Sequence, residues 1–325
     1  MFNIAIIGQE GHFNYALEAL RARDDIRLCA IAPGTPGGAL DGLRKQTAGF
    51  APREYADYHE MLENEHPDIA VINPEFHLTA RITMDCLNAG AHCFSEKPVA
   101  TELDELEALE RCHAGSGRAL CGMFGIKEEP WYMALSRAVR EGAIGEVRLV
   151  QGQKSYRMGI RPPFYSHREL FGGLIPWVAI HAVDWAMSVA GKRCLNVAAS
   201  HSTHANGGNG DMEATSAVLM ELEDGVIVTV TADFLRPTTS ARHDDDRLRV
   251  TGTRGMIEAV DGRVYLEGAE PKHELELPPR GIYFGDFVDA IARGEAEALA
   301  QEAFDVTRVC LTARKSADER TRISL

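Results

Sequence analysis

The chain has 325 residues, of which 45% are hydrophobic and 25% are charged, as is ordinary for a soluble globular protein. Its length favours two compact domains over one. The formal net charge of −14 argues against a nucleic-acid-binding protein, because phosphate neutralisation needs clustered Lys and Arg. Seven cysteines, an odd number scattered along the chain, do not form the pattern of a disulfide framework.

The first third of the chain alternates short apolar runs with amphipathic segments. The apolar runs predict five strands, at 4–7, 26–32, 68–73, 91–96 and 119–124. The amphipathic segments predict helices at 13–23, 77–89 and 101–115. Strands that alternate with helices are typical of parallel crossovers. Residues 1–122 of this α/β protein are therefore predicted to form a Rossmann domain, a doubly wound parallel sheet that binds a dinucleotide.

The pattern changes after residue 122. A helix is predicted at 129–141, another at 176–189, and helical segments return after 283. Most of the remaining sequence reads as strands, at 146–156, 215–235, 247–252 and 263–268. Residues 123–325 are therefore predicted to form an α+β domain with a large, mostly antiparallel sheet. This domain is expected to bind substrate and to mediate oligomerisation. Its C-terminal helix either stays with it or packs back on the first domain.

The first turn departs from the glycine pattern of dinucleotide-binding sites. The pattern G-x-G-x-x-G would place glycines at 8, 10 and 13, but the sequence has Gly8, Glu10 and Phe13, with Gly11 and His12 between them. The second glycine normally lets the backbone approach a pyrophosphate, and the third allows close helix packing. Glu10 and Phe13 therefore weaken the predicted cofactor turn, although Gly11 can take over the close approach.

Four stretches together resemble the Gfo/Idh/MocA family, the glucose-fructose oxidoreductase and inositol dehydrogenase group. They are the opening strand and turn, "PDIAVINPEFHLTARITMDCLNAGAHCFSEKPVA" at 67–100, "REGAIGEVRLV" at 140–150 and "GGLIPWVAIHAVDW" at 172–185. The resemblance spans the whole chain, and its most specific motif is Glu96-Lys97-Pro98 after A-G-x-H. It implies an NAD(P)-dependent oxidoreductase that transfers a hydride between nicotinamide and a secondary hydroxyl or carbonyl of a sugar, cyclitol or sugar-acid-like substrate.

The resemblance also implies the residues of the site. Lys97 and His181 would be the catalytic acid–base pair, the ammonium stabilising a developing alkoxide and the imidazole accepting or returning the hydroxyl proton. Substrate-binding residues are predicted at Tyr156, Arg168, Trp177 and Asp184. Cofactor-binding residues are predicted at Gly8, Glu10, Gly11, His12, Phe13, Pro33, Asn73, Pro74, His77, Glu96 and Lys97. No metal site is predicted.

Two further departures leave the cofactor and the substrate open. Pro33 stands where NAD-binding proteins place an acidic residue on the ribose, so the cofactor is either NAD or NADP, with Thr35, Arg44 or Lys45 as partners for a 2′-phosphate. Trp177 stands where the family commonly has an aspartate. An indole can stack on a sugar face but cannot accept a proton, so either an altered substrate or weaker support of the general base is expected.

Two polar stretches of the second domain have more than one interpretation. Arg157, Arg161 and Arg168 either bind the carboxylate or phosphate of an acidic sugar or are ordinary surface charges. The acidic run "HDDD" at 243–246 is predicted to be a solvated turn, and the alternative, an oxygen-rich magnesium site, has no further support in the sequence.

The departures also leave two alternatives to a dehydrogenase open. One is a binding or regulatory protein that keeps the scaffold without catalysis, and the other is a non-redox enzyme that uses the cofactor transiently. The sequence has no basic n-region or cleavage site, and no apolar run near the roughly 20 residues of a membrane helix. We therefore expect a cytoplasmic protein that binds a small sugar-like molecule, has no nucleic-acid or membrane partner, and forms homodimers or homotetramers through the second domain's sheet.

Overall fold

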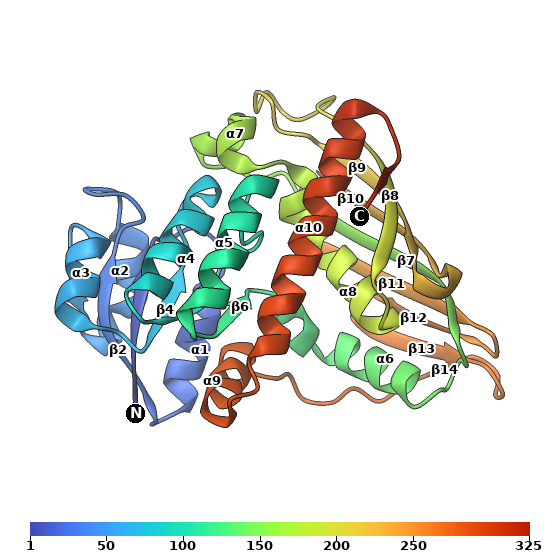
Figure 1. The fold of residues 1–325 in the computed structure, drawn as a ribbon. Helices are drawn as coiled ribbons and strands as arrows, with labels where there is room; N and C mark the ends of the chain where they lie inside the picture. Colours follow the sequence, from blue (N-terminus) through green and yellow to red (C-terminus); the bar gives the residue numbers. More distant parts are fainter. The chain divides into compact units, whose positions relative to one another are not determined.

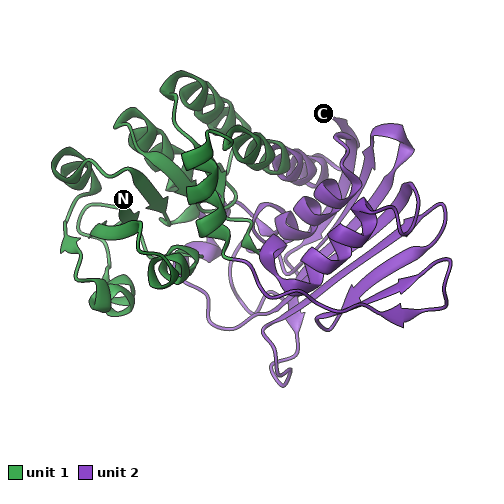
Figure 2. Cartoon of the chain, turned by 90° about the horizontal axis from the view of Figure 1, so that it is seen from below, with its two compact units in different colours: residues 1–125, 282–307 green, residues 126–281, 308–325 purple.

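The computed structural model describes all 325 residues, which divide into two compact units (Figures 1 and 2). Unit 1 comprises residues 1–125 and 282–307. Unit 2 comprises residues 126–281 and 308–325. The chain therefore leaves unit 1 after its first third, builds most of unit 2, and returns to unit 1 before it ends in unit 2.

Unit 1 contains a parallel sheet of six strands in the order β3-β2-β1-β4-β5-β6. The strands are β1 (Phe2–Ile7), β2 (Ile26–Ala32), β3 (Arg53–Glu54), β4 (Ile69–Ile72), β5 (His92–Ser95) and β6 (Leu120–Gly122). Every residue of β4 is buried, as expected for a parallel strand that is covered on both faces. This strand order is that of the doubly wound Rossmann fold, which confirms the predicted fold of the N-terminal part.

The helices of unit 1 connect these strands. They are α1 (Asn14–Ala22), α2 (Asp41–Thr47), α3 (Tyr58–Glu65), α4 (Thr79–Asn88), α5 (Leu103–Ser116), α9 (Tyr283–Arg293) and the first part of α10 (Glu297–Glu319). Short helical turns lie at Ala48–Phe50 and Phe76–Leu78. Figure 1 shows α4 and α5 side by side on one face of the sheet. Helices α2 and α3 were not predicted from the sequence, because both are short.

The late segment of the chain completes the core of unit 1. The ring of Phe94 on β5 lies 4.9 Å from that of Phe284, 5.7 Å from that of Phe287 and 5.8 Å from that of Tyr283, measured between ring centroids. The Tyr283 hydroxyl also donates to the carbonyl of Gly122 at 3.0 Å. Helix α9 is therefore part of the Rossmann unit although 157 residues separate it from the end of the unit's first segment.

Unit 2 contains a sheet of nine strands in the order β14-β13-β12-β11-β7-β10-β9-β8-β15. The strands are β7 (Val147–Arg157), β8 (Cys194–Ser202), β9 (Thr215–Leu222), β10 (Ile227–Arg236), β11 (Asp244–Gly252), β12 (Met256–Val260), β13 (Arg263–Glu267), β14 (His273–Glu274) and β15 (Ile323–Ser324). Only the pair β7–β10 is parallel. The prediction of a large, mostly antiparallel sheet is confirmed.

Helices cover one face of this sheet. The helices of unit 2 are α6 (Pro130–Arg140), α7 (Arg168–Phe171), α8 (Ile180–Ala190) and the end of α10, with short turns at Gly125–Glu128, Pro163–Ser166 and Glu223–Gly225. Helix α8 packs on β7, β10 and β11, and α6 packs on β12 and β13. The opposite face exposes Leu219, Ile227 and Leu235, each at least 39% accessible.

One helical segment of unit 2, Arg168–Ala190, is long and apolar enough by length and composition to cross a membrane. Within the protein, however, 89% of its most apolar window is buried. Its hydrophobicity is thus accounted for by its place under the sheet, as in the core helix of a globular domain.

The expectation of a solvated turn at 243–246 is wrong. Asp244, Asp245 and Asp246 begin β11 and pair with residues 154–156 of β7. Because side chains alternate along a strand, Asp244 and Asp246 point to the helix-covered face. There the ammonium of Lys154 lies 2.6 Å from Asp246, which makes a buried carboxylate tolerable.

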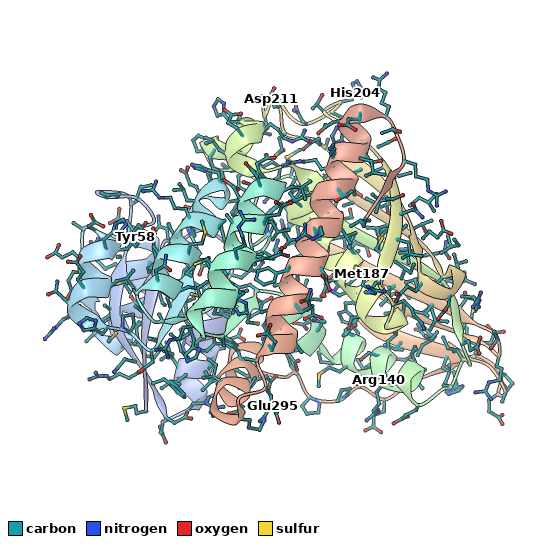
Figure 3. The ribbon with its side chains drawn as sticks, in the orientation of Figure 1. Tyr58, Arg140, Met187, His204, Asp211 and Glu295 are labelled. Carbon is teal, nitrogen blue, oxygen red and sulfur yellow. The ribbon has the colours of Figure 1, made fainter.

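The Gly-rich stretch at 204–211 is a closed loop after β8. The side-chain amide of Asn206 donates to the carbonyls of Gly210 and Met212 at 2.9 and 3.0 Å. Figure 3 shows His204 and Asp211 near its two ends. One asparagine thus holds the ends of the loop together.

Candidate functional site

The turn after β1 requires glycine at its first position. Gly8 has a φ of +80°, and a Cβ there would lie 2.2 Å from the backbone oxygen of Asn73. Its N–H donates to Ala32 O at 2.9 Å. The ends of β1, β2 and β4 therefore meet at this residue, at the carboxyl edge of the sheet where ligands bind in such folds.

Gly11 is held just as closely, against Glu96. Its φ is +86°, and a Cβ would lie 1.9 Å from Glu96 Oε2. The Glu96 carboxylate accepts hydrogen bonds from the backbone N–H of His12 at 2.6 Å, from Asn73 Nδ2 at 3.2 Å and from the backbone N–H of Lys97 at 2.9 Å. Four other predicted site residues, Gly11, His12, Asn73 and Lys97, are thus brought together around the Glu96 carboxylate.

Burial and charge act in opposite directions on Glu96. Complete burial raises the pKa of its carboxyl, but the charge and hydrogen bonds of His12 and the charge of Lys97 outweigh this effect, so the pKa lies below its ordinary value of 4.5. The His12 ring nitrogen Nδ1 is 3.0 Å from both carboxylate oxygens. Glu96 therefore carries a negative charge at neutral pH.

The two residues that replace the fingerprint glycines occupy different environments. Phe13 is 5% exposed and lies directly before α1, so its ring belongs to the core. Glu10 is partly exposed, and its N–H donates to Asn73 O at 2.9 Å. Burial and, to a lesser extent, the charge of Glu75 raise the pKa of the Glu10 carboxyl.

The residues of the turn fit a dinucleotide. The backbone N–H groups of Gly11 and Phe13 have no acceptor within the protein, and they precede the N-terminus of α1. Such N–H groups at a helix start are donors for a pyrophosphate. Gly8 supplies the close approach of the backbone.

The remaining predicted cofactor residues line the same edge of the sheet. Pro74 and His77 follow β4, and a Cβ at Gly34 would lie 2.7 Å from Pro74 Cβ. Pro33 directly follows β2 and lines a cavity of about 400 Å³. Their roles as cofactor ligands stay predictions.

The cavity beyond β2 is bordered by charged groups from α2 and β3. It is lined by Pro33, Asp41, Arg44, Glu54 and backbone of the Gly-rich segment between them. Arg44 lies 2.8 Å from Asp41 and 2.9 Å from Glu54. Two carboxylates therefore surround a single guanidinium, whereas Lys45 and Thr35, the other suggested partners of a 2′-phosphate, do not line the cavity.

In unit 2, the predicted acid–base residue His181 lies on α8. A π-helical turn at Ile175–Ala179 precedes this helix, and Trp177 lies in the turn. Such turns are rare and occur frequently at functional sites. His181 and Asp184 are both buried, one helical turn apart, and Asp184 lies 3.2 Å from the ammonium of Lys127. The helix thus buries an imidazole and a carboxylate in an otherwise apolar segment.

The predicted substrate residues of unit 2 have partners of their own. Tyr156 stacks on His243, with ring centroids 4.8 Å apart, and Trp177 meets Tyr165 edge-on at 6.2 Å. Arg168 forms ion pairs with the buried Glu213 and, at 3.1 Å, with Asp318. Two carboxylates already neutralise this guanidinium, which favours a structural role for Arg168 over recognition of an acidic substrate.

Sequence reasoning missed the buried pair of Lys154 and Asp246. The available signal was the alternation of charged and apolar residues across 247–250, which is typical of a strand and directly follows the aspartates. The three aspartates before it are typical of a turn, so the strand was predicted to begin only at residue 247.

Comparison with known proteins agrees with the fold. Residues 2–122 match the oxidoreductase family described as an NAD-binding Rossmann fold, and residues 132–258 match the GFO/IDH/MocA C-terminal domain. A solved structure of a candidate oxidoreductase from Thermotoga maritima is 39% identical, with a TM-score of 0.96 over 99% of this chain and 100% of that chain.

More distant relatives include named dehydrogenases. An inositol 2-dehydrogenase from Rhizobium meliloti is 25% identical over 85% of this chain and 81% of its own length. The chain spans about half the length of the inositol 2-dehydrogenase from Salmonella paratyphi B, at 21% identity over 56% of this chain and 51% of that protein. A levoglucosan dehydrogenase in complex with NADH and levoglucosan shares the fold, at 19% identity and a TM-score of 0.85 over 100% of this chain and 99% of that chain. The protein belongs to the Gfo/Idh/MocA family of oxidoreductases, with an NAD-binding Rossmann fold in its N-terminal part.

Proposed function

We propose that the protein is an NAD(H)-dependent dehydrogenase that acts on a secondary hydroxyl, or the corresponding carbonyl, of a sugar-like or cyclitol molecule in the cytoplasm. The observation that carries the proposal is the turn at Gly8 and Gly11, which leaves N–H donors at the start of α1 and holds Glu96 next to Lys97. Membership of an oxidoreductase family and the inositol dehydrogenase relatives support the substrate class.

Bound NAD would supply the hydride acceptor, and NADH the hydride donor. The chain itself must then handle the proton of the hydroxyl. We assign to the Lys97 ammonium the stabilisation of the developing alkoxide, and to the His181 imidazole the acceptance or return of the proton.

The charges beyond β2 support NAD rather than NADP. Asp41 and Glu54 outnumber the one guanidinium, Arg44, so the dianionic 2′-phosphate of NADP would meet a net negative surface, whereas a 2′-hydroxyl could donate to a carboxylate. We therefore propose that these carboxylates take the place of the acidic residue that Pro33 replaces.

We also propose self-association as a homodimer or homotetramer through the open face of the nine-stranded sheet. Leu219, Ile227 and Leu235 are exposed on two neighbouring strands of this face, and a second copy packed there would bury them. Light scattering after size-exclusion chromatography should give at least twice the monomer mass. Leu219→Lys should lower that mass.

Titration of NADH, followed by its own nicotinamide fluorescence, tests the cofactor assignment. Saturable binding below millimolar NADH, at least ten-fold tighter than that of NADPH, is expected. If neither nucleotide binds, the protein keeps the Rossmann fold but not its cofactor, and the cofactor assignment is wrong.

Lys97→Met tests the catalytic assignment. Turnover of a substrate should fall by at least about 100-fold, because alkoxide stabilisation by one positioned donor contributes that much or more. The dissociation constant for NADH should change little. The matched control is Lys315→Met, an exposed lysine of α10, which should leave turnover unchanged. Equal turnover in the two variants would remove Lys97 from the mechanism.

A further inference from the structure

A double glycine in unit 2, Gly172-Gly173, links α7 to the π-helical turn. Both glycines have a positive φ, of +82° and +104°. A Cβ at Gly173 would lie 3.1 Å from Arg168 Nε. It would also lie 3.4 Å from both Arg314 Cδ and Glu213 Oε1. Charged side chains from three separate segments of the chain therefore close on this piece of backbone.

The first N–H of the helical run that follows is bound by Glu213. The run begins at Leu174, passes through the π-helical turn and ends in α8 at Ala190. Leu174 N donates to Glu213 Oε2 at 3.0 Å in the protein interior. The first N–H groups of a helix have no acceptor within the helix, and the helix dipole favours a negative charge beside them. Glu213 therefore caps this run although it lies 39 residues further along the chain.

The carbonyl on the other side of Gly173 is held as well. Arg314 Nη1 donates to Gly172 O at 2.7 Å, and the Arg314 side chain is 9% exposed. The two peptide groups that flank Gly173 are thus fixed by different elements. Arg314 reaches one of them from α10, and Glu213 reaches the other from the loop before β9.

The Glu213 carboxylate is itself held in place. It is 1% exposed, its Oε1 forms an ion pair with Arg168, and the same oxygen lies 3.4 Å from His201 Nδ1. Arg168 and His201 both reach a second carboxylate, Asp318 of α10, at 3.1 and 3.2 Å. A buried carboxylate is tolerated only where it is paired and hydrogen-bonded. One oxygen of Glu213 takes these partners, and the other is available to Leu174.

We propose that Glu213 is a positioning residue for the acid–base helix, which holds Trp177 and His181 in their relative orientation through the N–H of Leu174. The proposal rests on the proposed function in taking His181 as the acid–base residue. The hydrogen bonds of the π-helical turn enclose one residue more than those of an α-helix. When Leu174 is released, the turn relaxes to an α-helix, and Trp177 rotates by about 100°, the angle of one residue, relative to His181.

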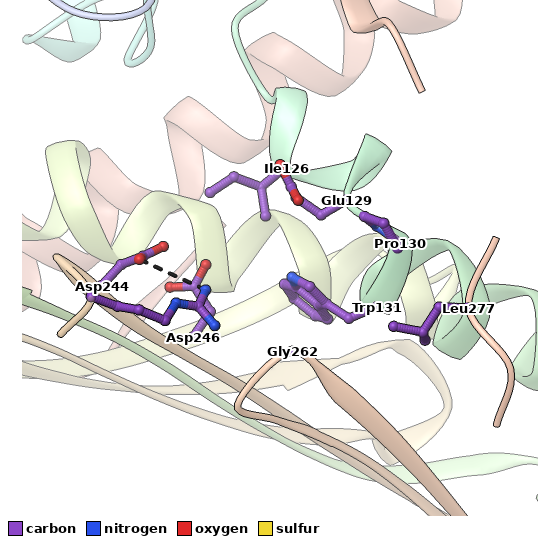
Figure 4. A pocket seen from close by; sticks show the side chains of 9 residues that line it. Ile126, Glu129, Pro130, Trp131, Asp244, Asp246, Gly262 and Leu277 are labelled. Atoms are coloured by element: carbon purple, nitrogen blue, oxygen red, sulfur yellow. Dashed lines mark ion pairs between the residues drawn. The ribbon is translucent and has the colours of Figure 1, made fainter. Parts of the chain in front are cut away.

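Fluorine NMR of the full chain labelled with 5-fluorotryptophan tests the proposal. The chain has three tryptophans. Trp177 lies in the π-helical turn, Trp185 lies on α8, and Trp131 lines a separate cavity at the start of α6 (Figure 4). Glu213→Ala should move the Trp177 resonance by more than its line width and leave the Trp131 resonance in place. Glu213→Gln keeps a carbonyl oxygen for Leu174 and should return the Trp177 resonance towards its original position.

Two further variants separate the cap from the charge of Glu213. Glu213→Asp keeps the charge on a side chain that is one methylene shorter, so its oxygen no longer reaches Leu174. The Trp177 resonance should then move as it does in Glu213→Ala, and this variant decides the question if Glu213→Ala fails to fold. The matched control is Glu169→Ala, which removes an exposed carboxylate on α7 and should move no resonance.

Turnover gives a functional readout of the same variants. Glu213→Ala should lower kcat at least about ten-fold, because a misplacement of about 1 Å at a reacting group can cost on the order of 100-fold. The KM for NAD should stay unchanged, and Glu213→Gln should recover most of kcat.

Four results overturn the proposal. They are an unmoved Trp177 resonance in Glu213→Ala, an equal movement of all three tryptophan resonances, a Glu213→Gln variant that behaves like Glu213→Ala, and an unchanged kcat in Glu213→Ala. The resonances are measured without cofactor or substrate. A chain that fails to bind NADH therefore contradicts the proposed function, while the Trp177 resonance still decides this proposal.

Discussion

Replacing Glu96 by Gln tests how much one buried carboxylate contributes to unit 1. A glutamine oxygen can take the place of Oε2 and keep the hydrogen bonds from His12 and Asn73, but its amide nitrogen then faces the N–H of Lys97, 2.9 Å from the atom it replaces. One hydrogen bond to a charged group is lost, and a buried donor is left without an acceptor. The free energy of unfolding should fall by about 2–4 kcal/mol.

The pH dependence gives a second readout of the same variant. Because the folded pKa of Glu96 lies below 4.5, its stabilisation is fully present above that ordinary value and is lost as the pH falls through the folded pKa. The gap in stability between the unmodified chain and Glu96→Gln should therefore be largest near neutral pH and shrink in acid.

Urea unfolding followed by far-UV circular dichroism measures both effects. Tryptophan fluorescence would not serve, because Trp131, Trp177 and Trp185 all belong to unit 2. The matched control is Glu63→Gln, an exposed carboxylate on α3. The assignment of these hydrogen bonds would be refuted if Glu96→Gln lowered the free energy of unfolding at neutral pH no more than the control does. It would also be refuted if the difference in stability between the unmodified chain and Glu96→Gln did not shrink in acid.

Three further substitutions test separate parts of the structure. Gly8→Ala should lower the free energy of unfolding by at least about 1–2 kcal/mol in urea titrations, because the new Cβ meets Asn73 O at 2.2 Å at a positive φ; wild-type stability would contradict this close approach. Lys154→Met should lower the free energy of unfolding by about 3–5 kcal/mol, because it leaves Asp246 buried and unpaired. Adding Asp246→Leu should recover part of that loss. If the losses of the two single variants simply add in the double variant, the two residues do not interact. Asp57→Ala should cost about 0.5–2 kcal/mol in thermal unfolding by removing the cap of α3, and substitution by Asn should cost less.

Much of unit 1 could be predicted from the sequence because its strands are buried on both faces. The apolar runs at 4–7 and 68–73 correspond to β1 and β4, and a parallel sheet of this kind leaves little choice of strand order. The topology also places Glu96 and the first turn at one edge. The hydrogen bond between His12 and Glu96, which are 84 residues apart, and the close approach of Gly11 to Glu96 depend on strand register, which no local pattern encodes.

In unit 2 the sequence pattern identified the type of sheet but not its polar pairs. The aspartates at 244–246 resemble a turn locally, and only the pairing of β11 with β7 brings a lysine to neutralise Asp246. Here the pairing with a neighbouring strand, and not the local composition, decides the structure. The same holds for α9, whose amphipathic pattern predicts a helix but does not show that it completes the core around Phe94.

The division of unit 1 into two segments has a consequence for how the chain folds during synthesis. Phe94 is made early, but its neighbours Phe284 and Phe287 emerge only after residues 126–281 have been translated. Until then the nascent Rossmann sheet carries an exposed aromatic surface, and domains that fold during synthesis normally do so from the N-terminus. The first-made part of this protein is therefore among the last to be completed, and ribosome-bound chains that end before residue 282 should be more sensitive to proteases in β5 and β6 than full-length chains.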